Sequence, residues 1–303
     1  MIMDIEETED ESVTPNEIPL HRGEELVGRE ANVVAGGAPT RVIAVAGDVG
    51  AGKTTLLTSI YERFQRGMFG GFCFAGSLTL VGFERRCHAS RIASGRSAPD
   101  TDRTRRSEQT AYLHLRLARP SEQTQFEILF TDISGEDFQA AKDSLPEARR
   151  LKVLTRADHL LLLIDSARLI DRTLRFEASQ SASTLLRSLH EAGMIGATSA
   201  IDVLLSKFDL VGTTTSQTDN RFIANFEEHL ARTFSPTCRE FRVARIAARP
   251  IHENHQSVDD LGDLFQHWAT SSTTSKHAPH YVAHVEELED CYDRYLLTAR
   301  NHG

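Results

Sequence analysis

The feature that most constrains this chain is the stretch 47-GDVGAGKTT-55, which directly follows the apolar run 42-VIAVA-46. It fits the pattern GxxxxGK[ST], which predicts a turn between a strand and a helix that holds phosphate. Glycines let successive backbone N–H groups point at an anion, the lysine adds a positive charge, and the following helix presents its positive end. The residues expected to contact a bound nucleotide are Gly47, Asp48, Val49, Gly50, Ala51, Gly52, Lys53, Thr54 and Thr55.

Short apolar runs alternate with amphipathic stretches downstream of this loop. We expect strands at 42–46, 126–130, 159–164, 201–205 and 240–247, and helices at 54–64, 171–192 and 220–234. This alternation is typical of a mostly parallel sheet whose two faces are both covered. The predicted fold class is therefore α/β: a P-loop NTPase with a mixed, mostly parallel sheet and helices on both faces.

The stretch 111-AYLHLRLAR-119 has a different pattern, because its leucines alternate with His114 and Arg116. Such alternation predicts an edge strand with one solvent-exposed face. The turn-forming residues 119–124 lead into the next strand. We therefore expect an antiparallel hairpin here.

A second motif, 132-DISGED-137, follows the predicted strand at 126–130. An aspartate at the carboxyl end of a neighbouring strand can hold Mg²⁺ through water, and this is the role expected for Asp132. Gly135 is expected to offer its backbone N–H to a γ-phosphate and to act as a hinge. The alternative is an ordinary turn between a strand and a helix.

A third motif, 206-SKFD-209, follows the strand at 201–205. It resembles the [NT]KxD motif of GTPases, in which the aspartate accepts hydrogen bonds from guanine and the lysine stem covers the base. Lys207 and Asp209 match, whereas Ser206 stands where asparagine is usual. We expect the shorter Ser206 side chain still to bond to the phosphate loop, with weaker nucleotide binding. A backbone contact from Ala247 to the base is a further prediction.

Together the three motifs resemble those of TRAFAC-class GTPases, a branch of the P-loop NTPases, over about residues 41–268. The runs 75–91, 101–104 and 130–138 are similar to the bacterial double-GTPase (DO-GTPase) family. Members of that family are found beside partner proteins in proposed conflict or defence systems. The resemblance implies GTP or GDP as ligand, Mg²⁺ as cofactor, and a molecular switch that acts with a regulatory or effector protein.

A long insert at 66–110 occupies the place where a switch loop supplies a threonine that closes on Mg²⁺ and the γ-phosphate. Thr104 is our choice, with Thr101 and Thr110 as alternatives. Between residues 83 and 108 the insert is rich in arginine: Arg85, Arg86, Arg91, Arg96, Arg103, Arg105 and Arg106. The simpler interpretation is a solvated or partner-facing basic loop. The sharper one is that Arg103 stabilises transition-state charge as an arginine finger in cis.

Two residues argue against efficient catalysis. Glu136 occupies the position where small GTPases carry the glutamine that orients the attacking water, and a carboxylate only accepts hydrogen bonds. Val49 stands where small GTPases often have glycine, and it would crowd a finger supplied by a partner. We therefore expect slow hydrolysis, helped by Asp137, by Arg103 or by a partner.

Composition sets the domain and partner predictions. The acidic residues 1–38 are expected to be a disordered leader, 39–270 the GTPase domain, and 271–303 a linker with a C-terminal helix. A net charge of −9 argues against a nucleic-acid partner. No apolar run approaches the roughly 20 residues of a membrane helix. The four scattered cysteines favour a reduced, cytoplasmic location.

The main prediction is thus a Mg²⁺-dependent GTPase that hydrolyses slowly and acts as a switch. Two alternatives remain open at this point. The first is a P-loop ATPase that carries the residues of 206–209 by chance. The second is a nucleotide-bound scaffold without turnover, whose arginine-rich insert docks a partner.

Overall fold

The computed structural model describes residues 23–90, 110–120, 124–211, 216–249 and 259–270. All of them belong to one compact unit within Met1–Ser271. Part of the insert (91–109) and the linker and helix predicted for 271–303 lie outside the described residues.

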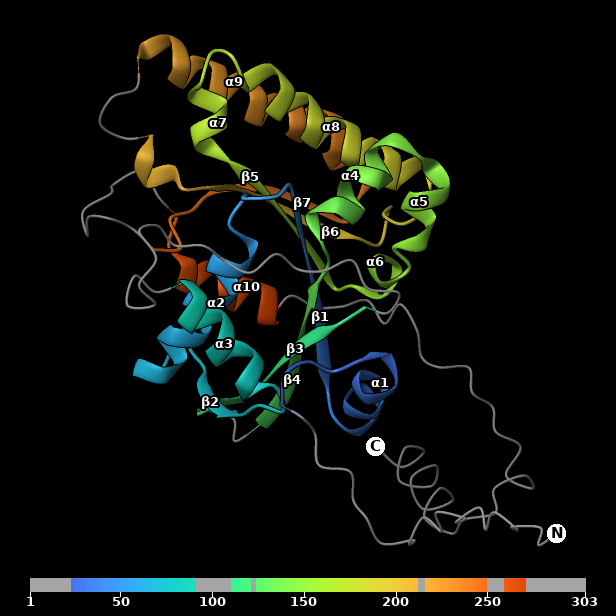
Figure 1. Ribbon diagram of the computed structural model, residues 1–303, viewed down its shortest axis with the longest axis vertical. Helices are drawn as coiled ribbons and strands as arrows, with labels where there is room; N and C mark the ends of the chain where they lie inside the picture. The colour runs from blue at the N-terminus through green and yellow to red at the C-terminus, as the bar shows by residue number, and fades with distance from the viewer. Residues whose placement is uncertain (1–22, 91–109, 121–123, 212–215, 250–258, 271–303) are drawn as a thin grey trace, which may run out of the picture. The chain divides into compact units, whose positions relative to one another are not determined.

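The described strands form one seven-stranded sheet in the order β2-β3-β4-β1-β5-β6-β7 (Figure 1). The pairs β4–β1, β1–β5, β5–β6 and β6–β7 are parallel, and β2–β3 and β3–β4 are antiparallel. The sheet is therefore mixed and mostly parallel, which confirms the predicted fold class. The strands are β1 (Thr40–Gly47), β2 (Cys73–Gly76), β3 (Tyr112–Arg119), β4 (Thr124–Asp132), β5 (His159–Asp165), β6 (Ala200–Ser206) and β7 (Glu240–Arg245).

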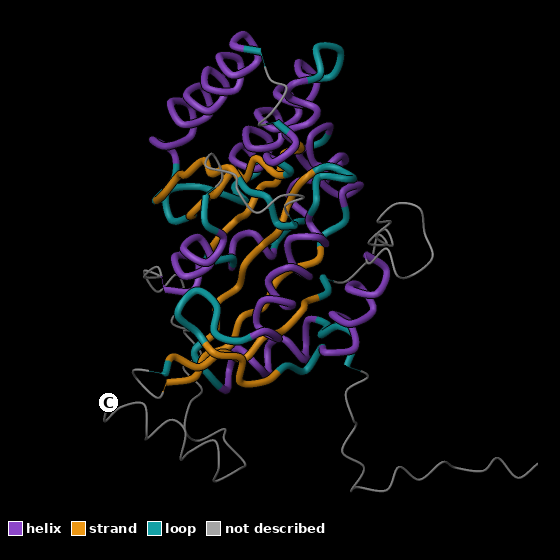
Figure 2. Tube along the Cα trace, turned by 90° about the vertical axis from the view of Figure 1, so that its left-hand side faces the viewer, coloured by secondary structure: helices purple, strands orange, loops and turns teal. Residues whose placement is uncertain are grey.

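Helices cover both faces of the sheet (Figure 2). Side chains of β1 alternate between two apolar cores, with Val42, Ala44 and Ala46 in one and Ile43 and Val45 in the other. This alternation is what a buried parallel strand requires.

Each core is closed by its own set of helices. The first contains residues of α1 (Gly28–Gly37), α4 (Gly135–Asp143), α5 (Leu145–Arg150), α6 (Val153–Arg156), α7 (Ser166–Ile170), α8 (Arg175–Glu191) and α9 (Gln217–Phe234). The second contains residues of α2 (Lys53–Arg66), α3 (Leu80–Ser90) and α10 (Leu261–Thr270).

The antiparallel hairpin is confirmed, but β3 is not an edge strand. The short β2, from the insert, pairs with its outer side. The expected solvent-exposed face is only partly present, because His114 is buried and its Nε2 lies 2.7 Å from Glu127 Oε2. Leu78 N also donates to His114 Nδ1 at 2.9 Å. The alternating pattern predicts that His114 faces solvent. It is buried instead because Glu127 of the neighbouring strand and Leu78 of the insert both contact it.

The prediction that residues 1–38 form a disordered leader is wrong for residues 23–38. Leu26 is fully buried and exchanges two 2.9 Å backbone hydrogen bonds with Tyr112. Helix α1 follows, and Glu25 pairs with Arg86 of α3. The acidic composition led to the wrong prediction because Glu24 and Glu25 pair with arginines of the insert. Arg85 NH1, for example, lies 2.6 Å from Glu24.

Gly82 in α3 tests this N-terminal attachment. A Cβ built on Gly82 would lie 1.8 Å from the carbonyl oxygen of Glu24. We expect Gly82→Ala to displace residues 23–27 and to cost about 2 kcal/mol of unfolding free energy, by analogy with overpacked cores. Denaturant unfolding checks this, with Gly36→Ala as the matched control because no heavy atom lies within 4 Å of its Cβ position. Equal stability of the two variants would contradict the attachment.

Candidate functional site

The carboxyl ends of the parallel strands meet at one edge of the sheet. Val45 pairs in register with Asp132, Leu205 with Arg245, and Asp165 with Ser206. In open α/β sheets this edge is where ligands bind. The three motifs of the sequence therefore come together in space.

The phosphate loop runs from the end of β1 into α2, as predicted. Gly47 has φ 143°, and a Cβ there would lie 2.6 Å from the carbonyl oxygen of Leu163, so no side chain fits at this position. Gly52 is the N-cap of α2 with φ 94°, in the left-handed region. Ala51 N donates to Asp48 O at 3.2 Å and closes the turn.

Lys53 reaches back over its own loop. Its Nζ donates to Gly47 O at 2.6 Å and to Asp48 O at 3.2 Å. Thr54 and Thr55 follow in the first turn of α2 and are half-buried. A cation, a helix N-terminus and a hydroxyl residue therefore lie together, which suits a phosphate and its metal ion.

The second motif links β4 to α4. Asp132 is the last residue of β4, and its side chain lies outside what the structure describes. Ser134 caps α4: its Oγ accepts from Asp137 N at 3.1 Å and donates to Asp137 Oδ2 at 2.6 Å. The Asp137 carboxylate is thereby engaged in the cap, whereas Glu136 is exposed.

Gly135, the first residue of α4, lies directly against the phosphate loop. A Cβ on Gly135 would be 2.9 Å from both the backbone nitrogen and Cγ2 of Val49. Val49 itself is 56% exposed, so its side chain stands at the open side of the loop. The start of α4 and the loop are therefore in contact through a position that only glycine fits.

The third motif borders a cavity of about 160 Å³ beside the loop. Its lining includes Gly52 and Thr55 of the loop and helix, Lys207 and Asp209 of the motif, and Ile246, Ala248 and Arg249 after β7. Ala247, predicted to contact the base, is buried and does not line this cavity. The cavity therefore extends from the phosphate loop to Asp209.

Lys207 and Ser206 are each held in place by a hydrogen bond. Only the bond from Ser206 to the phosphate loop was predicted from the sequence. Lys207 has φ 54°, and its Nζ donates to Asp165 Oδ2 at 2.6 Å. Ser206 Oγ donates to Ala51 O at 2.7 Å and lies 3.1 Å from Ile164 O. The predicted hydrogen bond from Ser206 to the phosphate loop is confirmed.

Removal of the Ser206 hydroxyl should therefore loosen the loop. In Ser206→Ala two buried carbonyl groups lose this partner, and we expect a loss of about 1–2 kcal/mol in unfolding free energy. The same change should weaken nucleotide binding a few-fold, since the loop loses a support. Thermal unfolding and nucleotide titration check both effects. If neither the unfolding free energy nor the nucleotide affinity changes, the hydrogen bond does not stabilise the phosphate loop.

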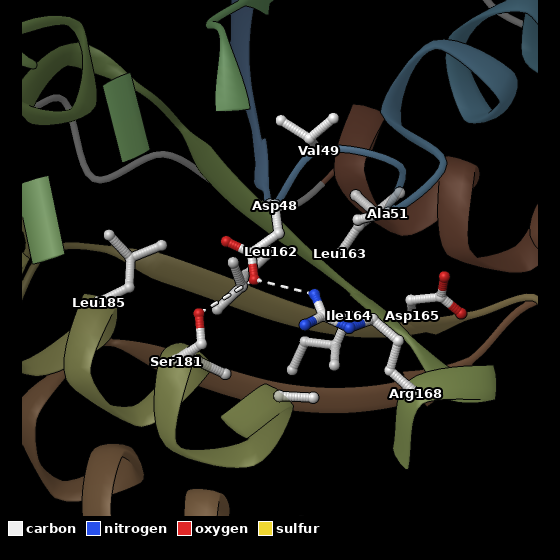
Figure 3. A pocket seen from close by; sticks show the side chains of 13 residues that line it. Asp48, Val49, Ala51, Leu162, Leu163, Ile164, Asp165, Arg168, Ser181 and Leu185 are labelled. Carbon is white, nitrogen blue, oxygen red and sulfur yellow. Dashed lines mark hydrogen bonds and ion pairs between the residues drawn. The ribbon is translucent and has the colours of Figure 1, made fainter. Parts of the chain in front are cut away.

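Behind the loop lies a smaller cavity of about 20 Å³, lined by loop residues, β5 and α8 (Figure 3). Asp48 points into it. Its carboxylate accepts from Ser181 Oγ at 3.0 Å and lies 3.8 Å from Arg168 NH1. Burial alone would raise the pKa of Asp48, but hydrogen bonds and charges from Lys142, Ser181 and Arg168 outweigh it and lower the pKa. Asp48 is therefore ionised at neutral pH.

The structure does not describe every predicted residue. Arg103, Thr104 and Thr101 lie outside the described residues, while Thr110 is half-buried just before β3. Sequence reasoning missed Lys142, Asp165 and several other residues around the loop: Arg168, Ser181, Ala248 and Arg249. Of these, only Asp165 carried a signal, since it directly follows the strand predicted at 159–164, as Asp132 follows the strand predicted at 126–130.

A P-loop fold with a phosphate loop, a D-x-x-G segment and an S-K-x-D motif at one sheet edge defines the class of P-loop GTPases. Residues 41–269 match the family model Double-GTPase 2. The chain belongs to this double-GTPase family, and it is accordingly a guanine-nucleotide-binding protein of the GTPase class.

Solved structures show weaker similarity. The signal recognition particle receptor SRb-GTP/SRX complex from Chaetomium thermophilum is 18% identical, with a TM-score of 0.42, 77% of this chain and 97% of that chain covered. The S. cerevisiae Ski7 GTPase-like domain bound to GTP is 14% identical, with a TM-score of 0.45, and 81% and 53% covered. No protein with a curated description matches the chain.

Among the described helices, none is both long and apolar enough to span a membrane.

Proposed function

We propose that this chain is a Mg²⁺-dependent GTP-binding switch that hydrolyses GTP slowly on its own. The observation that carries the proposal is the single cavity lined both by Gly52 and Thr55, which flank Lys53 in the chain, and by Lys207 and Asp209 of the third motif. Membership in a GTPase family supports it.

We assign each chemical role of a GTPase site to a residue of this chain. Backbone N–H groups from Gly50 to Thr55 and the Lys53 ammonium would hold the phosphates, and Gly135 N–H would contact the γ-phosphate. Thr54, Asp132 and Thr104 are the residues we assign to Mg²⁺, which would neutralise charge on the phosphates. Lys207 and Asp209 would hold the guanine, with Ala248 nearer to the base than Ala247.

Slow hydrolysis follows from the exposed Glu136 beside Gly135. A carboxylate repels phosphate oxygens and cannot donate a hydrogen bond, whereas a glutamine can orient the attacking water. We expect Glu136→Gln to raise the single-turnover rate of phosphate release roughly tenfold. Lys53→Met, which removes the phosphate-binding cation, is the matched inactive control. A slower rate in Glu136→Gln would instead make Glu136 a catalytic base.

A nucleotide-bound scaffold is the second candidate, and the same Glu136 favours it. In a scaffold, bound GTP would stay intact during hours of incubation with Mg²⁺. Phosphate release by the purified chain, measured alone and with candidate partners, separates the two. We propose a regulatory protein as the stimulating partner, a bacterial conflict or defence system as the setting, and the cytoplasm as the location, in line with the family resemblance.

A further inference from the structure

Lys142, in the last turn of α4, is a buried charge that the proposed nucleotide chemistry does not use. Its side chain is 8% exposed, and its Nζ donates to Asp48 Oδ1 at 2.9 Å and to Ser181 Oγ at 2.6 Å. The Ser181 hydroxyl in turn donates to Asp48 Oδ2 at 3.0 Å. One ammonium group therefore joins three elements: α4, the phosphate loop and α8.

The charge that Lys142 meets is unusual for its place. Asp48 is an ionised carboxylate inside a loop that is built to attract an anion. Arg168 lies 3.8 Å from Asp48 (Figure 3). Arg168 also pairs with Glu177 at 3.2 Å, so its charge is shared. An uncompensated carboxylate would lower the positive potential that draws phosphate to the loop. Lys142 is the cation that compensates it most directly.

The same helix contacts the loop a second time. At its first residue, Gly135 packs against the backbone of Val49. Near the C-terminal end of α4, Ala141 O accepts a 2.6 Å hydrogen bond from Ser188 Oγ of α8. This bond holds the turn of α4 that carries Lys142. The position of α4 therefore determines whether Lys142 reaches Asp48.

We propose that Lys142 is a positioning residue that couples the docking of α4 to the preference of the loop for GTP over GDP. When α4 is docked, the ammonium neutralises Asp48; when α4 moves away, the carboxylate acts on the phosphates unopposed. GTP carries about one more negative charge than GDP, so it loses more from the undocked state. By linkage, GTP stabilises the docked helix to the same degree. This inference rests on the proposed function, because both nucleotides must bind at the loop.

The test is the ratio of the GDP and GTP dissociation constants, measured by titration for the full chain and its variants. Lys142→Met should lower the preference for GTP roughly fivefold, through the unpaired Asp48 charge. The double variant Lys142→Met with Asp48→Asn should return the ratio to within about twofold of the unmodified chain. Lys152→Met, which removes the same charge from an exposed lysine, should leave the ratio unchanged.

A purely structural role for Lys142 gives a different result. Lys142→Met would then weaken both nucleotides equally, and the second substitution would not restore the ratio; either outcome overturns the inference. If Lys142→Met does not fold, Asp48→Asn alone still tests the inference. This variant should raise the preference for GTP over GDP. An unchanged ratio of the two dissociation constants would contradict the inference. Failure of the unmodified chain to bind GTP or GDP would instead overturn the proposed function, and this inference with it.

Discussion

Asp209→Asn should weaken GTP binding by about a hundredfold, because hydrogen bonds to a charged group contribute about 1.5–3 kcal/mol each. Asp209 lines the cavity next to Lys207, where a carboxylate can accept from the N1 and N2 groups of guanine. An asparagine amide can instead donate to the 2-oxo group of xanthine. The variant should therefore bind xanthosine triphosphate more tightly than the unmodified chain does, which competition titration measures.

Asp263→Asn is the matched control for this exchange. Asp263 is exposed in the first turn of α10 and does not line the cavity, so the same loss of charge there should leave GTP binding unchanged. If Asp209→Asn changes the affinity for neither GTP nor xanthosine triphosphate, Asp209 does not contact the base. The P-loop ATPase alternative would then gain support.

Gly135→Ala should have the second large effect. The added Cβ would meet the backbone nitrogen of Val49 at 2.9 Å, so either the phosphate loop or the start of α4 must shift. A displacement of about 1 Å at a reacting centre costs on the order of a hundredfold in rate. We expect a loss of that size in single-turnover phosphate release, with the fold retained because α4 packs on α8 through other residues.

Gly196→Ala provides the comparison, since no heavy atom lies within 4 Å of its Cβ position. It should release phosphate at the rate of the unmodified chain. A Gly135→Ala variant with the same rate would show that contact between α4 and the loop is not needed for hydrolysis.

The central sheet could be predicted because its signals are local. Apolar runs mark β1, β4, β5 and β6, and the loop at 47–55 fixes what lies between β1 and α2. The positions of Asp132 and Asp209 followed from the same rule, that parallel strands end at one edge. The hydrogen bond from Ser206 to the loop could be predicted because the motif already places that residue beside it.

The features that could not be predicted depend on contacts between distant segments. The short β2 lies in an insert without strong periodicity, and only pairing with β3 makes it a strand. Residues 23–38 look like an acidic tail until Arg85 and Arg86 of α3 neutralise them. Lys142 carries no motif, and its importance follows only from its distance to Asp48. In each case a tertiary partner outweighs the local signal.

The most direct measurement is competition between Mg²⁺-GTP and Mg²⁺-ATP for the purified full chain, with fluorescent GDP as the displaced probe. We expect GTP and GDP to displace the probe at one site per chain, and ATP to leave it bound even at a hundredfold excess, because the role proposed for Asp209 is to select guanine. Equal displacement by ATP, or no specific binding of the probe, would contradict a guanine-nucleotide switch.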